Sequence, residues 1–230
     1  MKKTVIILIL VFTGCFISSG IAQFQIGPLV GGNLSGVNID PDVQGRNINY
    51  VTRFTAGVAI TYNFSSMFAV QLEPAYTQRG ASIYSAETDF GLILEIDQGI
   101  EMSYIDIPVL FKVSFDAQFI KPYVLAGGNI GFPLQDTKLT IDKVIANGQD
   151  VIYLLPADLI EQELKNESTD YGLNFGAGIS FPLGFIDMFI QAQYNLGLSD
   201  LNDEPAIEGV EKDVIKNRGI QVKTGLLITL

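Results

Sequence analysis

Five charged residues stand within stretches of the chain that otherwise alternate apolar residues with small or polar ones: Glu73, Arg79, Asp106, Lys112 and Lys223. In an extended chain alternate residues share one face, and all five fall on the polar face. If that face is enclosed, charges of both signs have to pair, because an isolated buried charge is very costly. We therefore predict a polar network, with Glu73 and Lys112 as the expected direct pair. Three glutamines share this face and are expected in the same network: Gln71, Gln191 and Gln193.

Groups suited to nucleophilic catalysis are scarce in this chain. It has no histidine, and its one cysteine is Cys15, which removes the commonest nucleophile–base pairs and tight zinc or copper sites. Asp200, Asp203, Glu204 and Glu208 could supply a carboxylate-only site or calcium ligands, but acidity in an exposed loop is usually solvated surface. The prediction is a non-enzymatic protein with no catalytic residue, metal site or cofactor.

The alternation itself predicts β-strands. In the segment 54–64, Phe54, Val58 and Ile60 share one face and Thr55 and Thr61 the other. The segments are roughly 11 to 14 residues long. Strands that cross a bilayer need about 9 to 11 residues, whereas strands of soluble proteins most often have about 5 to 6. Eight segments show the pattern: 25–37, 54–64, 68–79, 103–113, 121–134, 171–181, 188–198 and 219–230.

The connections between these segments alternate in length. The long ones span 38–51, 80–102, 135–170 and 199–218, and the short ones span 65–67, 114–120 and 182–187. Outer-membrane barrels have long extracellular loops and short periplasmic turns. We therefore predict an all-β fold, an eight-stranded antiparallel up-and-down transmembrane β-barrel with both ends on the periplasmic side. The alternative is a soluble periplasmic sandwich.

The N-terminal segment predicts export. Lys2 and Lys3 precede an apolar run, and small residues follow it up to Ala22, as in a secretory signal peptide over residues 1–22 before a barrel domain over 23–230. A rival interpretation is lipidation at Cys15. The chain carries a net charge of −11, and it becomes more acidic when the two lysines are removed, which argues against binding nucleic acid. The expected location is the cell outer membrane, with outer-membrane lipid around the barrel.

An eight-stranded barrel is just wide enough for side chains to fill. The charged face is therefore interpreted as a polar plug that closes the lumen, with a gated polar path as the alternative. Activity is then expected in the extracellular loops, through a structural role or a protein partner. The alternative function is a transport module, either a narrow channel or a subunit of a protein-secretion complex.

Three local features carry further expectations. Pro74 and Pro108 remove ladder donors within strands, so we expect a bulge or a missing bond at each. Residues 156–165 predict a short amphipathic helix that docks on a partner or caps the barrel mouth. The apolar stretch 90–96 either extends the strand 103–113 as a hairpin or forms a contact patch.

Five short stretches resemble motifs of the PorT-like outer-membrane β-barrel family of Bacteroidota: Gly31–Ser35, Leu72–Gly80, Tyr104–Lys112, Lys121–Gly128 and Gln191–Leu198. The resemblance runs over nearly the whole chain after the signal peptide. It implies the barrel fold and the outer-membrane location, and it includes prolines at the positions of Pro74 and Pro108. The namesake type is similar to a component of a protein-secretion and gliding apparatus, so the resemblance also implies the secretion subunit as an alternative.

Overall fold

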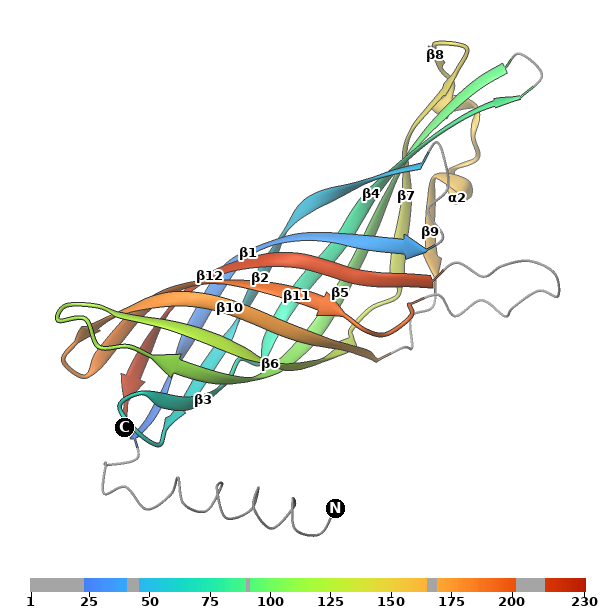
Figure 1. Cartoon of the computed structure of the whole chain (residues 1–230). Coiled ribbons are helices and arrows are strands. Elements are labelled where there is room, and N and C mark those ends of the chain that lie inside the picture. Colours follow the sequence, from blue (N-terminus) through green and yellow to red (C-terminus); the bar gives the residue numbers. More distant parts are fainter. Residues whose placement is uncertain (1–22, 41–45, 90–91, 165–168, 202–213) are drawn as a thin grey trace, which may run out of the picture.

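The computed structural model describes residues 23–40, 46–89, 92–164, 169–201 and 214–230, and the predicted signal peptide lies outside these ranges. The described part is built almost entirely of antiparallel strands (Figure 1). Two short helices, η1 (Ile152–Leu154) and α2 (Ala157–Ile160), interrupt them. The strands are β1 (Gln23–Asp40), β2 (Arg46–Asn63), β3 (Phe68–Leu72), β4 (Ala75–Asp89), β5 (Leu92–Ser114), β6 (Lys121–Pro133), β7 (Thr137–Ala146), β8 (Gln149–Asp150), β9 (Glu161–Leu164), β10 (Asp170–Leu183), β11 (Ile186–Gly197) and β12 (Val214–Thr229).

The strands close into a ring. β1 pairs with both β2 and β12, and the ring continues from β2 through β3 and β4 to β5, β6, β10, β11 and back to β12. β3 and β4 follow one another along the same two neighbours, so they act as one member of an eight-membered up-and-down barrel. Each predicted segment matches one member of this ring, and the predicted fold is confirmed.

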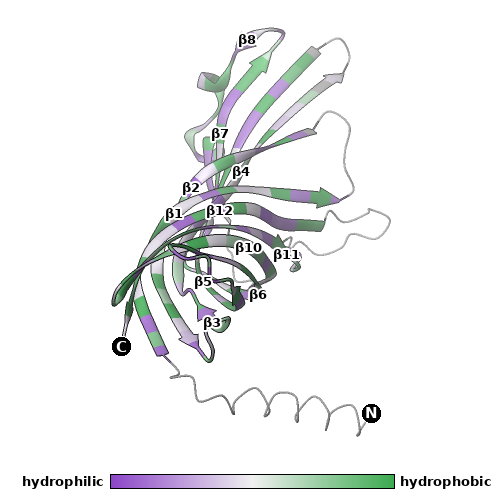
Figure 2. Cartoon of the chain, turned by 60° about the vertical axis from the view of Figure 1, so that its left-hand side comes forward, coloured by the Kyte–Doolittle hydropathy of each residue, from purple (hydrophilic) through white to green (hydrophobic). Residues whose placement is uncertain are grey.

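The period-two pattern separates two surfaces of the wall. On β1, Phe24, Ile26 and Val30 are exposed, whereas their neighbours Gln25 and Leu29 are buried. The same alternation around the ring gives an apolar outer belt and a largely polar lumen, and Figure 2 shows hydrophobic and hydrophilic residues alternating along the strands. Among the described residues, no helix is long and apolar enough to cross a membrane.

The two ends of the barrel differ. At one end, here called the turn end, β10 and β11 are joined through Gly184 and Phe185, and the first and last strands meet where the Leu230 amide donates to the Phe24 carbonyl at 2.9 Å. At the other end, the loop end, strands project well beyond the ring (Figure 1). The predicted asymmetry of connections is therefore present.

The projecting part corrects the predicted long loops. β4 and β5 stay paired out to Asp89 and Leu92, so residues 93–96 extend β5 in a hairpin. Of the two expectations for the stretch 90–96, the hairpin extension is therefore the one found for its described residues. β7 pairs with the outer part of β5, and β8 and β9 pair with β7. We call this projection, residues 80–89, 92–101 and 137–164, the arm. The loop prediction was wrong because these residues alternate only weakly, so their pattern does not reveal the strands that pair along β5.

At the two prolines within strands, the second of the two expected outcomes is found, a missing bond without a bulge. The partners of β3 and β4 keep the same register across Glu73 and Pro74, so no bulge forms there. Pro108 likewise lies within an unbroken β5–β6 register. The carbonyls of these prolines still accept bonds, from Val58 N at 3.0 Å and Glu73 N at 3.2 Å, so only the missing proline donors are lost. The predicted helix over 156–165 is only the four-residue α2, after which the chain pairs with β7 as β9.

Glycine at position 178 gives the lumen room for a large side chain. A Cβ there would lie 2.5 Å from the Tyr123 hydroxyl oxygen and 2.7 Å from the Ile190 carbonyl oxygen. We expect Gly178→Ala to lower the free energy of unfolding by about 1–3 kcal/mol, because overpacking forces neighbouring groups to move. Thermal unfolding of the detergent-solubilised protein, followed by circular dichroism, measures the loss.

The matched control is Gly128→Ala on the adjacent strand β6. Gly128 is exposed on the outer face, and the nearest atom to an added Cβ, the Gly172 carbonyl oxygen, is 4.0 Å away. This change is expected to leave the transition where it is. Equal transitions for the two variants would show that the lumen tolerates extra volume at Gly178.

Candidate functional site

The turn-side half of the lumen is organised around the Glu73 carboxylate, which is fully buried. Lys223 Nζ donates to Glu73 Oε2 at 2.9 Å. Three glutamine amides also donate to the carboxylate: Gln71 at 2.6 Å, Gln191 at 2.7 Å, and Gln193 at 3.0 and 3.1 Å. A buried carboxylate with one cation and several amide donors is satisfied without water.

Each of these glutamines also accepts a hydrogen bond at its own carbonyl oxygen. The donors are Lys112 to Gln71 at 3.1 Å, Tyr123 to Gln191 at 2.9 Å and Lys223 to Gln193 at 3.3 Å. The glutamines therefore bridge Glu73 to a second layer of donors. This network ties together β3, β5, β6, β11 and β12, so it fixes five members of the ring at one point.

The expected direct pair is corrected by this arrangement. Glu73 pairs with Lys223, and Lys112 reaches it only through Gln71. Lys112 Nζ instead lies 3.9 Å from the centre of the Tyr123 ring, where a cation is attracted to the aromatic face. The sequence placed Glu73 and Lys112 on neighbouring strands, but curvature of the wall brings the more distant β12 across the lumen.

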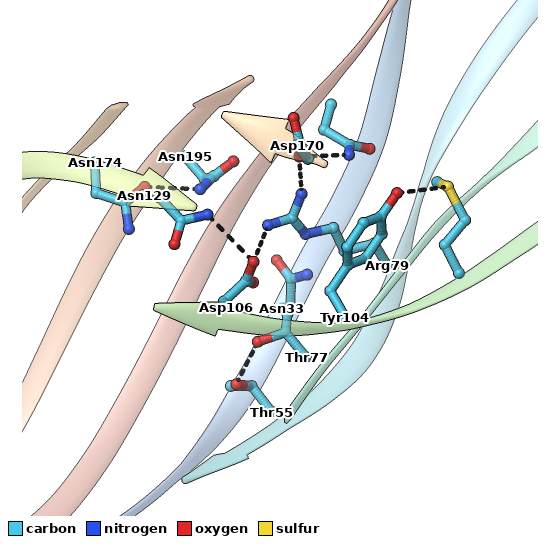
Figure 3. A network of polar contacts seen from close by, with 12 residues as sticks. Asn33, Thr55, Thr77, Arg79, Tyr104, Asp106, Asn129, Asp170, Asn174 and Asn195 are labelled. Carbon is cyan, nitrogen blue, oxygen red and sulfur yellow. Dashed lines mark hydrogen bonds and ion pairs between the residues drawn. The ribbon is translucent and has the colours of Figure 1, made fainter. Parts of the chain in front are cut away.

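The loop-side half of the lumen is organised around Arg79 (Figure 3). Its guanidinium bonds Asp106 Oδ1 at 2.6 Å and forms an ion pair with Asp170. Asn129 donates to Asp106 at 3.2 Å and Asn217 donates to Asp170 at 2.9 Å. The guanidinium also lies 4.7 Å from the centre of the Tyr104 ring. One cation thus holds carboxylates from β5 and β10 on opposite sides of itself.

Among the described residues, Asp170 is a buried charged lumen residue that the sequence analysis did not predict. In the sequence it falls at the end of the long connection 135–170, one residue before the predicted segment 171–181. The available signal was parity, since Asp170 shares its face with the buried Asn174. With Asp170, the described part of the chain has six charged side chains at most 5% exposed, three acids and three bases: Glu73, Asp106, Asp170, Arg79, Lys112 and Lys223. The two signs are therefore equal in number.

The two halves are not individually neutral. Glu73 lies with two lysines, whereas Arg79 lies with two aspartates. The Arg79 cluster also has more acceptors than donors. Four of its buried oxygens have no hydrogen-bond partner among the described residues: Asp106 Oδ2, Asn129 Oδ1, Asp170 Oδ1 and Asn217 Oδ1. The Glu73 cluster is thus the more fully satisfied of the two.

Apolar groups pack in the lumen between and beyond these clusters. Leu110 separates Lys112 from Asp106 along β5, and it packs with Tyr123 and Leu125. Nearer the turn end, Phe189 and Leu227 pack with Leu29, Ala59 and Ala75. At the loop end a third cluster joins Val37, Ala81, Met102 and Tyr104, with Ile39, Ile48, Ile100, Leu201 and Ile215 packed against it.

One hollow lies beside the Arg79 cluster. It measures about 180 Å³, including space open to solvent, and is too narrow to hold a water molecule. Its lining is Asn33, Ser35, Arg79, Asn195, Asn217, Arg218, Gly219 and Gln221. Polar amides and hydroxyls surround it, but it offers no room for a substrate.

The other candidate residues do not assemble into a site within the described ranges. Asp203, Glu204 and Glu208 lie outside them. Asp200 Oδ1 accepts from the Ile215 amide at 3.0 Å, so it fastens the chain to the start of β12. In the residues that the structure covers, no three aspartate, glutamate or cysteine side chains are grouped so as to hold a metal ion.

Comparisons with known proteins found one matching family model and several similar solved structures. A family model described as "Outer membrane protein beta-barrel domain" matches residues 18–203. Similar solved structures include Neisserial surface protein A, with 14% identity, TM-score 0.44, and coverage of 89% of this chain and 96% of that one. OprG from Pseudomonas aeruginosa has 13% identity, TM-score 0.44, and coverage of 91% and 96%. Ail, the attachment invasion locus protein of Yersinia pestis, has 16% identity, TM-score 0.37, and coverage of 89% and 98%. No curated protein matches the chain.

The lysines of the Glu73 cluster should differ in their effect on stability. We expect Lys223→Met to lower the free energy of unfolding by about 3–5 kcal/mol, because it leaves the buried Glu73 without its paired cation. Lys112→Met should cost less than about 1.5 kcal/mol, since it removes a cation whose partners are an amide and a ring. Urea unfolding of the refolded barrel measures both. Equal losses, or a larger loss for Lys112→Met, would show that the pairing is different.

The Arg79 cluster allows a rescue experiment. Arg79→Met is expected to cost about 3–5 kcal/mol, because two buried carboxylates then face each other without a cation. Adding Asp106→Asn and Asp170→Asn should recover most of that loss in the same unfolding assay.

A matched control for this experiment is Arg53→Met. Arg53 pairs with Glu101 at 2.7 Å, but the side chains are 26% and 52% exposed, so the change should cost at most about 1 kcal/mol. A triple variant as unstable as Arg79→Met would mean that Arg79 acts through packing rather than charge.

Proposed function

This chain belongs to the outer membrane protein beta-barrel domain family and is located in the outer membrane, and from that premise we propose that it is a non-enzymatic barrel with a closed lumen that acts through its extracellular arm. With this location the turn end is periplasmic and the loop end extracellular. The observation that carries the proposal is the lumen itself. Its six charged side chains are buried and equal in sign count, and apolar clusters lie between and beyond them.

A lumen of this kind supports a structural role rather than conduction. Moving an ion past Glu73 or Arg79 would require breaking bonds that the buried groups cannot replace with water. Eight strands also leave an interior that side chains can fill. The proposal assigns the polar network to holding the ring together.

The arm is the part of the described chain left free for interaction. β7, β8 and β9 pair with β5 or with one another and are not members of the ring. They extend the wall outward at the extracellular end, where a partner has access (Figure 1). The proposal therefore assigns binding of a protein partner to the part of the arm that carries these strands, residues 137–164.

A second candidate is a subunit of an outer-membrane secretion complex of the PorT-like kind. It is supported by the stretches 72–80 and 104–112, which resemble that family and supply four of the six lumen charges: Glu73, Arg79, Asp106 and Lys112. Under this candidate the arm contacts other subunits. A stoichiometric partner with secretion activity would distinguish it from a stand-alone surface protein.

Planar-bilayer recording tests the closed lumen. The purified wild-type protein is expected to give no discrete conductance steps, because its lumen charges are buried and held by hydrogen bonds. A 16-stranded porin inserted under the same conditions is the positive control. Discrete steps whose size changes on Glu73→Gln would contradict the closed lumen and favour a narrow channel.

Exchange of the arm tests its role. A chain in which residues 137–163 are replaced by a short Gly-Ser linker should still assemble, since the ring pairings do not use them. Affinity purification from native outer membranes in mild detergent should recover a partner with wild type and not with the exchanged chain. Recovery of the same partner with both chains would place binding outside residues 137–163 and would contradict the proposal.

A further inference from the structure

The segment between β8 and β9 leaves large apolar side chains uncovered in the arm. η1 and α2 pack against β7, and Ile152, Leu155 and Ile160 are half-buried. Tyr153 and Leu154 are nevertheless 77% and 67% exposed. Unlike the exposed residues of the outer belt, these side chains belong to the projecting arm, so lipid does not account for their exposure.

Carboxylates flank this apolar group along the chain. Asp150 precedes η1, Asp158 lies within α2, and Glu161 and Glu163 follow it in β9; all four are exposed. Asp150 also holds the start of η1, because its Oδ1 accepts from the Ile152 amide at 3.0 Å. We define Tyr153, Leu154, Leu159, Asp150, Asp158 and Glu161 as the arm patch.

Charge selects the kind of occupant. Among the arm side chains that the structure describes, eight are carboxylates and two, Lys138 and Lys143, are basic. A second copy of this chain would bring like charges together, and like-charge contacts cost several kcal/mol at an interface. An anionic lipid surface is disfavoured for the same reason. A cationic surface is attracted by the negative charge of the arm, and an apolar surface is stabilised by burying Tyr153 and Leu154.

We propose that the arm patch binds a cationic amphipathic segment of a protein partner, whose apolar side chains cover Tyr153 and Leu154 while its basic side chains face Asp150, Asp158 and Glu161. This inference rests on the proposed function, because it names the part of the arm that binds and the chemistry of its partner. The apolar contact slows dissociation of the bound segment. The carboxylates raise its association rate.

The experiment uses the full-length barrel in nanodiscs of phosphatidylcholine. The probe is a fluorescein-labelled 16-residue peptide of lysine and leucine in an amphipathic pattern, and empty nanodiscs give the lipid background. Wild type should bind above that background, and binding should weaken as salt rises because exposed charges are screened. Tyr153→Ser with Leu154→Ser should weaken it at least tenfold at every salt concentration.

Two matched controls identify the surface. Phe119→Ser removes an aromatic side chain that is 84% exposed on the opposite, periplasmic end, and it should leave binding unchanged. Asp158→Asn should slow association about two- to threefold, whereas Asp142→Asn, an equal charge change elsewhere on the arm, should have a smaller effect. An oligolysine of the same charge should bind at least tenfold more weakly than the amphipathic peptide.

The contrary outcomes separate the two proposals. If wild type binds no more than empty nanodiscs, or if the double serine variant binds as wild type does, the arm patch inference is overturned while a partner site elsewhere on the arm stands. Oligolysine binding as tightly as the amphipathic peptide also overturns it, because the surface would then be merely acidic. If arm exchange leaves native partner recovery unchanged, the proposed function itself fails.

Discussion

The buried carboxylate of Glu73 is the constraint on which the rest of the barrel depends. An acid removed from water must be met by donors on every side, and a single lysine cannot supply them. Here the donors are the ammonium of Lys223 and three glutamine amides, which together form a shell around the carboxylate. Two of these glutamines in turn accept hydrogen bonds from Lys112 and Tyr123. Because these groups come from five ring members, the shell can close only when the ring has closed in the right register.

The second cluster solves the opposite problem. Arg79 carries one positive charge that two aspartates share, so the loop-side half has an excess of acid where the turn-side half has an excess of base. The two excesses cancel only over the whole lumen. Leu110, which packs with Tyr123 and Leu125, lies between Lys112 and Asp106 along β5. Gly178 makes this packing possible because it has no side chain where the Tyr123 ring lies.

The interior of the barrel and the projecting arm therefore have different roles. Inside, the Glu73 carboxylate is fully hydrogen-bonded, and the hollow beside Arg79 is too narrow for a ligand. Outside the ring, the arm extends strands β4 and β5 and adds β7 and its neighbours, with uncovered apolar side chains and unbalanced carboxylates. Recognition of another molecule needs groups that are still available, and those groups lie in the arm.

The sequence by itself determined the ring and its two surfaces, because period-two alternation and strand length are local properties of Phe54 to Phe64 and its counterparts. It also placed Glu73, Arg79, Asp106, Lys112 and Lys223 on one face by parity alone. Tertiary structure decided which of them meet: Lys223 rather than Lys112 bonds Glu73, and Asp170 joins Arg79. It also decided that β7, β8 and β9 form outside the ring. The ion-pair partners depend on curvature and register across the lumen, so local alternation does not reveal them. The arm strands are held by pairing with β5 more than by an amphipathic pattern of their own, so local alternation does not predict them either.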